Sequence, residues 1–233
     1  MEKGKLYLIP TSLSGMPLVD VYPENILTII REIKTFVVET PKIGRSFLKG
    51  LYKDVKIFDL KFYTLNENIR QISPIIYDLK SGHDIGVISD AGAPGIGDMG
   101  TDLVFEAQRN EINVIPIVGP SAIMLAIMAS GLSGQSFAFN GYLPKEQEAR
   151  VKKIKQLEEA SHKLNQAQVF IETPYRAQYV YEDIIKSCKD NTYLSLSVDL
   201  TDEKGFSKTK RAGEWKKENV DISKRQVVFI IQK

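Results

Sequence analysis

The residues best suited to chemistry lie in one loop near the middle of the chain, between Ile88 and Thr101. Its stretch Asp90–Gly100 contains four glycines, one proline and two aspartates. Glycine lets a backbone bend and approach a ligand closely, and the carboxylates of Asp90 and Asp98 can accept hydrogen bonds from hydroxyl or amine groups. An ordinary turn between a strand and a helix requires fewer of these residues. The composition therefore favours a ligand-binding loop over a simple turn.

The loop also contains the spacing G-x-G-x-x-G at 95–100, which is typical of dinucleotide-binding proteins. That motif should follow its strand at once, and an acidic residue should end the next strand about 20 residues later. Gly95 instead lies seven residues beyond Ile88, and positions 118–121 read V-G-P-S. We therefore expect no dinucleotide fold. The lack of a G-x-x-x-x-G-K-[ST] sequence also argues against a P-loop nucleotidase.

Few side chains are available for metal binding or for nucleophilic catalysis. The chain of 233 residues has two histidines, His83 and His162, and a single cysteine, Cys188. These numbers argue against a zinc site, a Cys/His pair or a Ser/His/Asp triad, and they exclude an internal disulfide. Cys188 lies in an apolar helical pattern, so we expect a core thiol in a protein of a reducing compartment.

Charge and hydropathy set broader limits. A formal net charge of +2 provides no overall field for polyanions, so any binding of nucleic acid would depend on local basic patches. No apolar stretch is long enough to span a membrane, and the apolar run Leu6–Ile9 near the start is too short for a signal peptide. We therefore expect a cytoplasmic protein without membrane contact.

The central loop is positioned by a strand predicted at Ile85–Ile88 and by a helix predicted over 101–110. In the same half of the chain, further strands are predicted at 5–9, 35–38, 55–60 and 113–117, and helices at 24–34, 43–51 and 66–80. Strands that alternate with helices imply an α/β fold with a mostly parallel sheet, in which ligands bind at the carboxyl ends of the strands. Polar loops at 10–15, 39–41 and 89–98 each follow a predicted strand, so we expect them to converge there.

A second α/β unit is predicted after Gly119-Pro120, which divides the chain into domains 1–118 and 119–233. Its predicted helices cover 122–129, 145–163 and 176–187, and its predicted strands cover 137–142, 167–171, 193–198 and 227–231. The segment Lys204–Lys217 contains six basic residues and one acidic residue, Glu214. This segment is either a phosphate-binding patch or a solvated face. For the charged helix at 145–163 the balance of both signs favours a solvated face.

Six motifs occur along the chain in a characteristic order: P-T at 10–11, E-T-P-K at 39–42, S-D-A-G-A-P-G-I-G-D at 89–98, G-P-S-A at 119–122, F-N-G-Y-L-P at 139–144 and E-T-P-Y-R at 172–176. In this order they resemble the tetrapyrrole-methylase superfamily and, within it, the branch of ribosomal RNA small-subunit methyltransferase I. The chain looks like a short, diverged member of that branch. The match covers nearly the whole chain, and the blocks at 89–98 and 119–122 are its most specific parts.

This resemblance implies two α/β domains that hold S-adenosylmethionine in a cleft between them, usually as a homodimer. It assigns the cofactor mainly to backbone and small groups of the matching loops. The residues carried over are Pro10, Ser89, Asp90, Gly92, Ser121, Ala122, Tyr142 and Leu143.

Methyl transfer from a sulfonium requires mainly the positioning of acceptor and methyl group, and the removal of one proton if the acceptor is a hydroxyl. The resemblance suggests a ribose 2′-hydroxyl of small-subunit ribosomal RNA as that acceptor. Glu39 or Glu172 would then serve as base or orienter. The residues expected to bind RNA phosphates are Arg45, Arg176, Lys208, Lys210 and Arg211.

The loops expected to face the substrate depart from the branch more than the cofactor loops do. Positions 10–15 read P-T-S-L-S-G where the branch usually has P-T-P-I-G-N, and 39–44 read E-T-P-K-I-G in place of E-D-T-R-x-T. Two alternatives therefore stay open: a methylase with another acceptor, either a small molecule or a different RNA, and a non-catalytic paralogue that binds the cofactor or the ribosome. A tetrapyrrole acceptor is disfavoured because the central loop is of the ribosomal RNA type.

Overall fold

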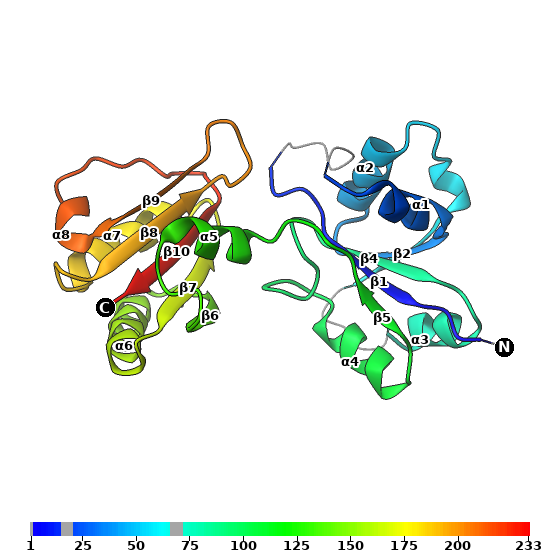
Figure 1. Cartoon of the computed structure of the whole chain (residues 1–233), viewed down its shortest axis with the longest axis horizontal. Helices are drawn as coiled ribbons and strands as arrows, with labels where there is room; N and C mark the ends of the chain where they lie inside the picture. Colours follow the sequence, from blue (N-terminus) through cyan, green and yellow to red (C-terminus); the bar gives the residue numbers. More distant parts are fainter. Residues whose placement is uncertain (1, 15–20, 66–71) are drawn as a thin grey trace. The chain divides into compact units, whose positions relative to one another are not determined.

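The computed structural model describes residues 2–14, 21–65 and 72–233. The chain divides into two compact units after Ser121, close to the boundary predicted after position 118. Each unit contains one five-stranded sheet (Figure 1). The first part of the helix predicted over 66–80 lies outside the described residues.

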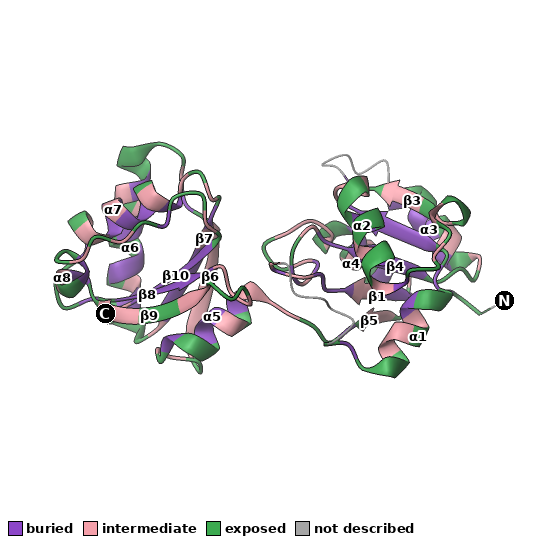
Figure 2. Ribbon diagram, turned by 90° about the horizontal axis from the view of Figure 1, so that it is seen from above, coloured by how far each residue is buried: buried purple, intermediate pink, exposed green. Residues whose placement is uncertain are grey.

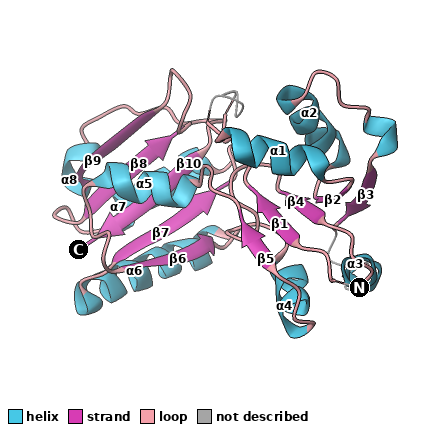
Figure 3. Cartoon of the chain, turned by 45° about the vertical axis from the view of Figure 1, so that its right-hand side comes forward, coloured by secondary structure: helices cyan, strands magenta, loops and turns pink. Residues whose placement is uncertain are grey.

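The first unit is built on a fully parallel sheet (Figure 3). Its strands are β1 (Leu6–Ile9), β2 (Thr35–Val38), β3 (Lys61–Thr64), β4 (Ile85–Ile88) and β5 (Val114–Pro116), in the order β3-β2-β4-β1-β5. β1 pairs in parallel with β4 and β5, and β2 pairs in parallel with β3 and β4. The carboxyl ends of the strands therefore meet at one edge of the sheet, which is where such sheets bind ligands.

Helices cover both faces of this sheet because side chains alternate along each strand. The helices are α1 (Glu24–Glu32), α2 (Pro41–Leu51), α3 (Ile72–Lys80) and α4 (Thr101–Arg109). In β2, Phe36 belongs to a core cluster with Ile30 of α1 and Leu48 of α2. The next residue, Val37, belongs to a separate cluster with Ile75 of α3. The alternation thus produces two cores, one on each face.

The strand predicted at 55–60 is wrong. This segment contains a short 3₁₀ helix, η2 (Ile57–Asp59), and the strand beside β2 is β3. Val55 and Leu60 pack against the core formed with α1 and α2. Hydrogen bonding toward β2 begins only at Lys61, whose amide donates to Lys34 O at 2.9 Å. The apolar residues of the segment therefore serve helix packing, which a strand-like composition cannot distinguish from pairing in a sheet.

The second unit contains a mixed sheet. Its strands are β6 (Phe137–Tyr142), β7 (Ala167–Glu172), β8 (Tyr193–Val198), β9 (Phe206–Arg211) and β10 (Val227–Gln232), in the order β6-β7-β10-β8-β9. β6 and β7 are parallel, whereas β10 pairs antiparallel with β7 and β8, and β8 pairs antiparallel with β9. The unpredicted strand β9 lies inside the basic segment Lys204–Lys217, whose polar residues lack the apolar alternation of a typical strand.

The faces of this sheet are also covered by helices. These are α5 (Ala122–Ser130), α6 (Gln147–Leu164), α7 (Ala177–Ser187) and the short α8 (Ala212–Trp215). On β10, Val228 packs with Ile123 of α5, whereas Phe229 packs in another cluster with Ile154 of α6 and Ile184 of α7. Figure 2 shows the central strands of this sheet as buried. The unit therefore has its own two-sided core.

Cys188 is buried directly after α7, as expected for a core thiol. Burial raises the pKa of its thiol to about 12, so the reactive thiolate is scarce at neutral pH. Over residues 2–14, 21–65 and 72–233, no helix is long and apolar enough to cross a membrane. The same residues contain no group of three or more side chains placed to hold a metal ion.

Candidate functional site

The loops that follow β1 and β4 are joined at the carboxyl edge of the first sheet. Thr11 N donates to Gly92 O at 2.8 Å, and Gly92 N donates back to Thr11 O at 3.2 Å. The Thr11 hydroxyl donates to Ser89 O at 3.1 Å, and the Ser89 hydroxyl donates to Gly92 O at 2.7 Å. Both hydroxyls are on buried residues, so these bonds fix the loops to each other.

Asp90 attaches a third loop, the one that follows β2. Thr40 donates its amide to Asp90 Oδ1 at 3.1 Å and its hydroxyl to Asp90 Oδ2 at 2.6 Å. The described parts of the three polar loops predicted to converge are therefore in contact. The resemblance assigns Asp90 to the cofactor. In this structure both of its carboxylate oxygens accept hydrogen bonds from Thr40, which holds Thr40 and the adjacent Glu39 in place.

Glu39 lies at this edge beside Asp90 and Asp98. Partial burial, a hydrogen bond with Asp98 and the negative charges of Asp98 and Asp90 raise the pKa of Glu39 to about 7. Burial and nearby like charges both disfavour the ionised form, so the effects act in the same direction. A carboxylate that titrates near neutral pH is suited to accept a proton from a substrate hydroxyl.

Two glycines make the close packing of these loops possible. Gly92 has a φ of +77°, in the left-handed region, and a Cβ there would lie 2.9 Å from Leu13 Cδ2. Gly119, in the loop after β5, packs against Pro10, and a Cβ there would lie 2.7 Å from Pro10 Cβ. The Tyr22 hydroxyl donates to Pro10 O. Pro10 is thus fixed between Tyr22 and the loop that contains Gly119.

We expect Gly119→Ala to weaken the binding of S-adenosylmethionine. The added methyl group would overlap Pro10 and displace the β1 loop, and overpacking of this kind costs about 1–3 kcal/mol. If this cost falls on the cofactor-bound state alone, the affinity measured by calorimetric titration falls about fivefold to about a hundredfold. Gly134→Ala is the matched control, because its Cβ would meet Ile127 Cγ2 at an ordinary 3.7 Å. Equal affinities for the two variants would contradict the prediction.

In the second unit, the predicted catalytic residue Glu172 is buried at the carboxyl end of β7. Its side chain is 0% exposed, and its Oε1 accepts the amide of Thr173 at 2.7 Å and the Thr173 hydroxyl at 3.2 Å. Arg176 Nη2 lies 3.0 Å from Glu172 Oε2 as an ion pair, although the geometry is not that of a hydrogen bond. This enclosure suits Glu172 for orienting Arg176 and not for taking a proton from a substrate.

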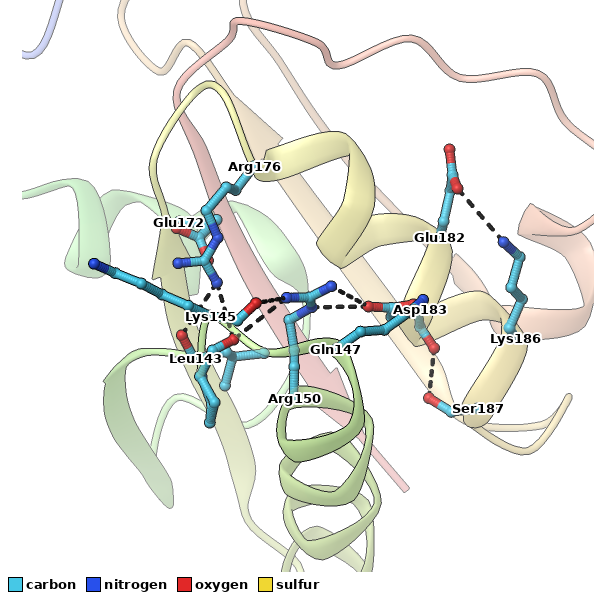
Figure 4. Close-up of polar contacts among 11 residues, drawn as sticks. Leu143, Lys145, Gln147, Arg150, Glu172, Arg176, Glu182, Asp183, Lys186 and Ser187 are labelled. Carbon is cyan, nitrogen blue, oxygen red and sulfur yellow. Dashed lines mark hydrogen bonds and ion pairs between the residues drawn. The ribbon is translucent and has the colours of Figure 1, made fainter.

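Arg176 connects Glu172 to the loop that follows β6 (Figure 4). Its Nη2 donates to Pro144 O at 2.9 Å and to Leu143 O at 3.3 Å. The side chain, predicted to hold RNA phosphate, is 24% exposed and engaged with its own domain. We therefore interpret Arg176 as a residue that positions the loop. Leu143 is itself buried.

A second arginine, Arg150 of α6, holds the same loop. Its Nη1 donates to Lys145 O at 2.6 Å, and its Nη2 lies 2.7 Å from Asp183 Oδ2. The side chains of Arg150 and Asp183 are 7% and 4% exposed. Gln147 donates to the other Asp183 oxygen at 3.0 Å. A buried pair of this kind is costly to break, so it fixes the loop firmly to α6 and α7.

The other basic residues predicted to bind RNA differ in whether other groups of the protein already engage their charges. Lys210 forms an ion pair with Glu218. Lys208 is exposed and has no ion-pair partner among the described residues. The remaining contacts place Arg45 over the ring of Phe62, Lys210 over Trp215 and Arg211 over Tyr193, with 5.4, 5.5 and 5.6 Å from the cation to the ring centre. Lys208 is therefore the freest of the set.

The predicted site residues fall into two groups, one in each unit. The first unit brings together Pro10, Glu39, Ser89, Asp90 and Gly92, and the second brings together Leu143, Glu172 and Arg176. Tyr142 ends β6 and is 56% exposed. Ser121 ends the first unit, and Ala122 begins α5.

Sequence reasoning missed Arg150 and Asp183. Arg150 lies in a helix whose many charges were interpreted as a solvated face. Asp183 offers a usable signal, because it shares a helix face with Val180 and Ile184, which are both 0% exposed. A single acid on an apolar face requires a buried partner.

Comparison with curated proteins shows relatives over most of the chain. Ribosomal RNA small subunit methyltransferase I of Escherichia coli O157:H7 is 27% identical over 99% of this chain and 78% of the relative. The protein of that name from Halalkalibacterium halodurans is 30% identical over 86% of this chain and 65% of the relative, and that from Vibrio cholerae is 28% identical over 84% and 65%. The chain thus spans between 65% and 78% of the length of these relatives. No family model matches the sequence.

Solved structures show the same fold at low sequence identity. Diphthine synthase matches with a TM-score of 0.65 at 18% identity, covering 98% of this chain and 89% of that chain. The methyltransferase CobJ matches with a TM-score of 0.63 at 13% identity, covering 99% and 94%. Uroporphyrin-III C-methyltransferase from Thermus thermophilus, complexed with S-adenosylhomocysteine, matches with a TM-score of 0.56 at 13% identity, covering 99% and 98%. The chain is thereby identified as an S-adenosylmethionine-dependent methyltransferase with the tetrapyrrole-methylase fold, similar over most of its length to ribosomal RNA small subunit methyltransferase I.

Proposed function

We propose that this protein methylates a ribose 2′-hydroxyl of small-subunit ribosomal RNA. The observation that carries the proposal is the similarity to ribosomal RNA small subunit methyltransferases over up to 99% of the chain. The pKa of about 7 at Glu39 adds a chemical reason, because a hydroxyl acceptor must lose a proton whereas many other acceptors need no base. An acceptor on the ribosome would also account for the expected cytoplasmic location.

We further propose that the matching loops hold the cofactor. The loop around Gly92 has a left-handed conformation at that residue and is held by the Ser89 hydroxyl, and it consists mainly of small residues. That character fits S-adenosylmethionine, whose amine, carboxylate and hydroxyl groups all need hydrogen-bond partners. The residues assigned to it are Pro10, Ser89, Asp90, Gly92, Ser121, Ala122, Tyr142 and Leu143.

In this mechanism the cofactor supplies an activated methyl group, and the protein supplies placement and one base. Thr40 and Asp90 hold the Glu39 segment in position. The Glu39 carboxylate would take the proton of the acceptor hydroxyl. The cofactor, when bound, would give its methyl group to that oxygen, lose its carbon–sulfur bond and leave as S-adenosylhomocysteine. Glu172 and the two arginines keep the β6 loop in place.

Two measurements test the proposal. Calorimetric titration with S-adenosylmethionine should show binding that Asp90→Ala weakens, because the variant releases Thr40. Transfer of labelled methyl groups to purified small ribosomal subunits should then give ribose-methylated nucleotides after digestion. Methylation of a base, or of a small molecule in an acceptor screen, would replace the proposed acceptor. Binding without turnover on any acceptor would favour the non-catalytic paralogue.

A homodimer remains part of the proposal. Sedimentation of the purified chain over a range of concentrations tests it directly.

A further inference from the structure

Two exposed tyrosines stand one turn apart at the start of α7. Tyr175 is 80% exposed and Tyr179 is 63% exposed. Arg176 N and Ala177 N both donate to Thr173 O, so helical geometry begins before the first residue of α7. Residues four apart in such geometry lie on the same face. Neither ring packs on another ring or cation, and neither hydroxyl is hydrogen-bonded within the part of the chain that the structure describes.

Folding of the unit does not explain this exposure. A tyrosine carries a large apolar ring, and a pair left in water forgoes the stabilisation that burial would give. Tyrosine is also one of the residues that most often dominate binding interfaces. The pair is therefore a candidate contact surface. It follows Glu172 directly, at the end of the sheet where the loop containing Leu143 lies.

Two lysines lie in loops that hydrogen-bond to the segment 174–176. Lys224 N donates to Pro174 O at 3.0 Å, which fixes its loop against the β7–α7 turn. Lys224 has a φ of +60°, a left-handed conformation that a lysine rarely adopts and that tends to occur at functional sites. Lys145 lies in the loop held by Arg176 and Arg150, and Figure 4 shows its side chain extending away from the arginine network. Both lysines are exposed, and neither has an ion-pair partner among the described residues.

Two of the acids near this surface are engaged. Glu172 is paired with Arg176, and Glu182 is paired with Lys186 and accepts from Gln178. The surface thus combines two free aromatic faces with two free cations. This combination matches unpaired RNA, whose bases stack on aromatic rings in a sequence-tolerant manner and whose phosphates bind lysine. A paired helix would hide the base faces.

We propose that Tyr175 and Tyr179 form a stacking platform for unpaired bases of the RNA substrate, with Lys145 and Lys224 binding the adjacent phosphates. This inference rests on the proposed function, since it assumes an RNA acceptor. It names the form of RNA that the enzyme takes: a loop, bulge or single strand with accessible bases.

The test uses the full chain and a fluorescently labelled, single-stranded RNA of mixed sequence, followed by anisotropy. The double variant Tyr175→Ala/Tyr179→Ala should bind about thirtyfold to 10⁴-fold more weakly, because stacking contributes about 1–3 kcal/mol per base and two rings are lost. Tyr175→Phe/Tyr179→Phe should bind as the wild type does, since it keeps both rings. Tyr77→Ala is the control, because Tyr77 is 71% exposed on α3 in the other unit. All variants should bind S-adenosylmethionine equally.

The lysines are tested by salt titration. Lys145→Ala/Lys224→Ala should reduce the slope of log affinity against log salt by about 1.4, as expected when two phosphate contacts to a single strand are lost. The same RNA annealed to its complement should bind the wild type more weakly than the single strand does.

The outcomes separate this inference from the proposed function. Unchanged RNA affinity in the tyrosine double-alanine variant overturns the platform even if the enzyme methylates ribosomal subunits. Lack of binding of this RNA by the wild type overturns the platform, whereas the proposed function is decided by methyl transfer to small ribosomal subunits. Tyrosine-dependent RNA binding without methylation of small subunits supports the platform and contradicts the proposed acceptor.

Discussion

Glu39→Gln should lower the rate of methyl transfer about 10²-fold to 10⁴-fold, the range typical for loss of a general base. Glutamine is close to glutamate in size but cannot take a proton. The Thr40 contacts with Asp90 do not involve the Glu39 side chain, so the loops should remain joined. Affinity for S-adenosylmethionine should therefore change little. Labelled methyl transfer and calorimetric titration on the same preparation measure the two quantities.

The pH dependence gives this prediction its sharpest form. Burial and the hydrogen bond and charge of Asp98 raise the pKa of Glu39 to about 7, and only its ionised form can act as a base. The wild-type rate should therefore rise with pH through about 7 and level off above it. Glu39→Gln should lack this limb.

Asp98→Asn provides the control. Removing the Asp98 charge takes away one of the causes that raise the pKa of Glu39, so the rising limb should move to lower pH while the plateau rate is retained. A wild-type limb that stays in Glu39→Gln, with a rate within about threefold of wild type, would exclude Glu39 as the base.

The parallel topology of the first unit could be predicted from the sequence and the mixed topology of the second could not, for a physical reason. In the first unit, apolar strands alternate with helices along the chain, and a polar loop follows each of β1, β2 and β4. These signals are local, so the convergence of the loops around Asp90 could be expected. In the second unit the position of β10 between β7 and β8 depends on pairing between residues far apart in sequence. No local pattern contains that information.

The roles of the candidate site residues could also be predicted only in part. Residue types and motif order indicated Asp90 and Glu39, but the partners that decide their roles come from other loops. The burial of Glu172 against Thr173 and Arg176 favours an orienting role over that of a base. The contacts of Arg176 with Glu172 and Pro144 O likewise favour a positioning role over phosphate binding. Burial and hydrogen-bond geometry are tertiary properties, so the residue types alone left these roles open.

Asp183→Ala is expected to have the largest effect on stability. It would leave the Arg150 charge buried without its partner, which typically costs about 3–5 kcal/mol. Chemical denaturation at fixed pH measures the loss. Glu182→Ala is the matched control on the same helix, because Glu182 pairs with Lys186 at an exposed position and should cost less than about 1 kcal/mol. Similar losses for the two variants would show that the buried pair has no special role.

A double variant separates the stability of the unit from the placement of the loop. Arg150→Leu/Asp183→Leu removes both buried charges, and apolar replacement of such a pair is often neutral or stabilising. It also removes the hydrogen bond from Arg150 to Lys145 O, which leucine cannot make. We therefore expect stability to recover while affinity for S-adenosylmethionine stays reduced by several-fold, the value of one or two hydrogen bonds. Full recovery of both would mean that Arg176 alone holds the β6 loop.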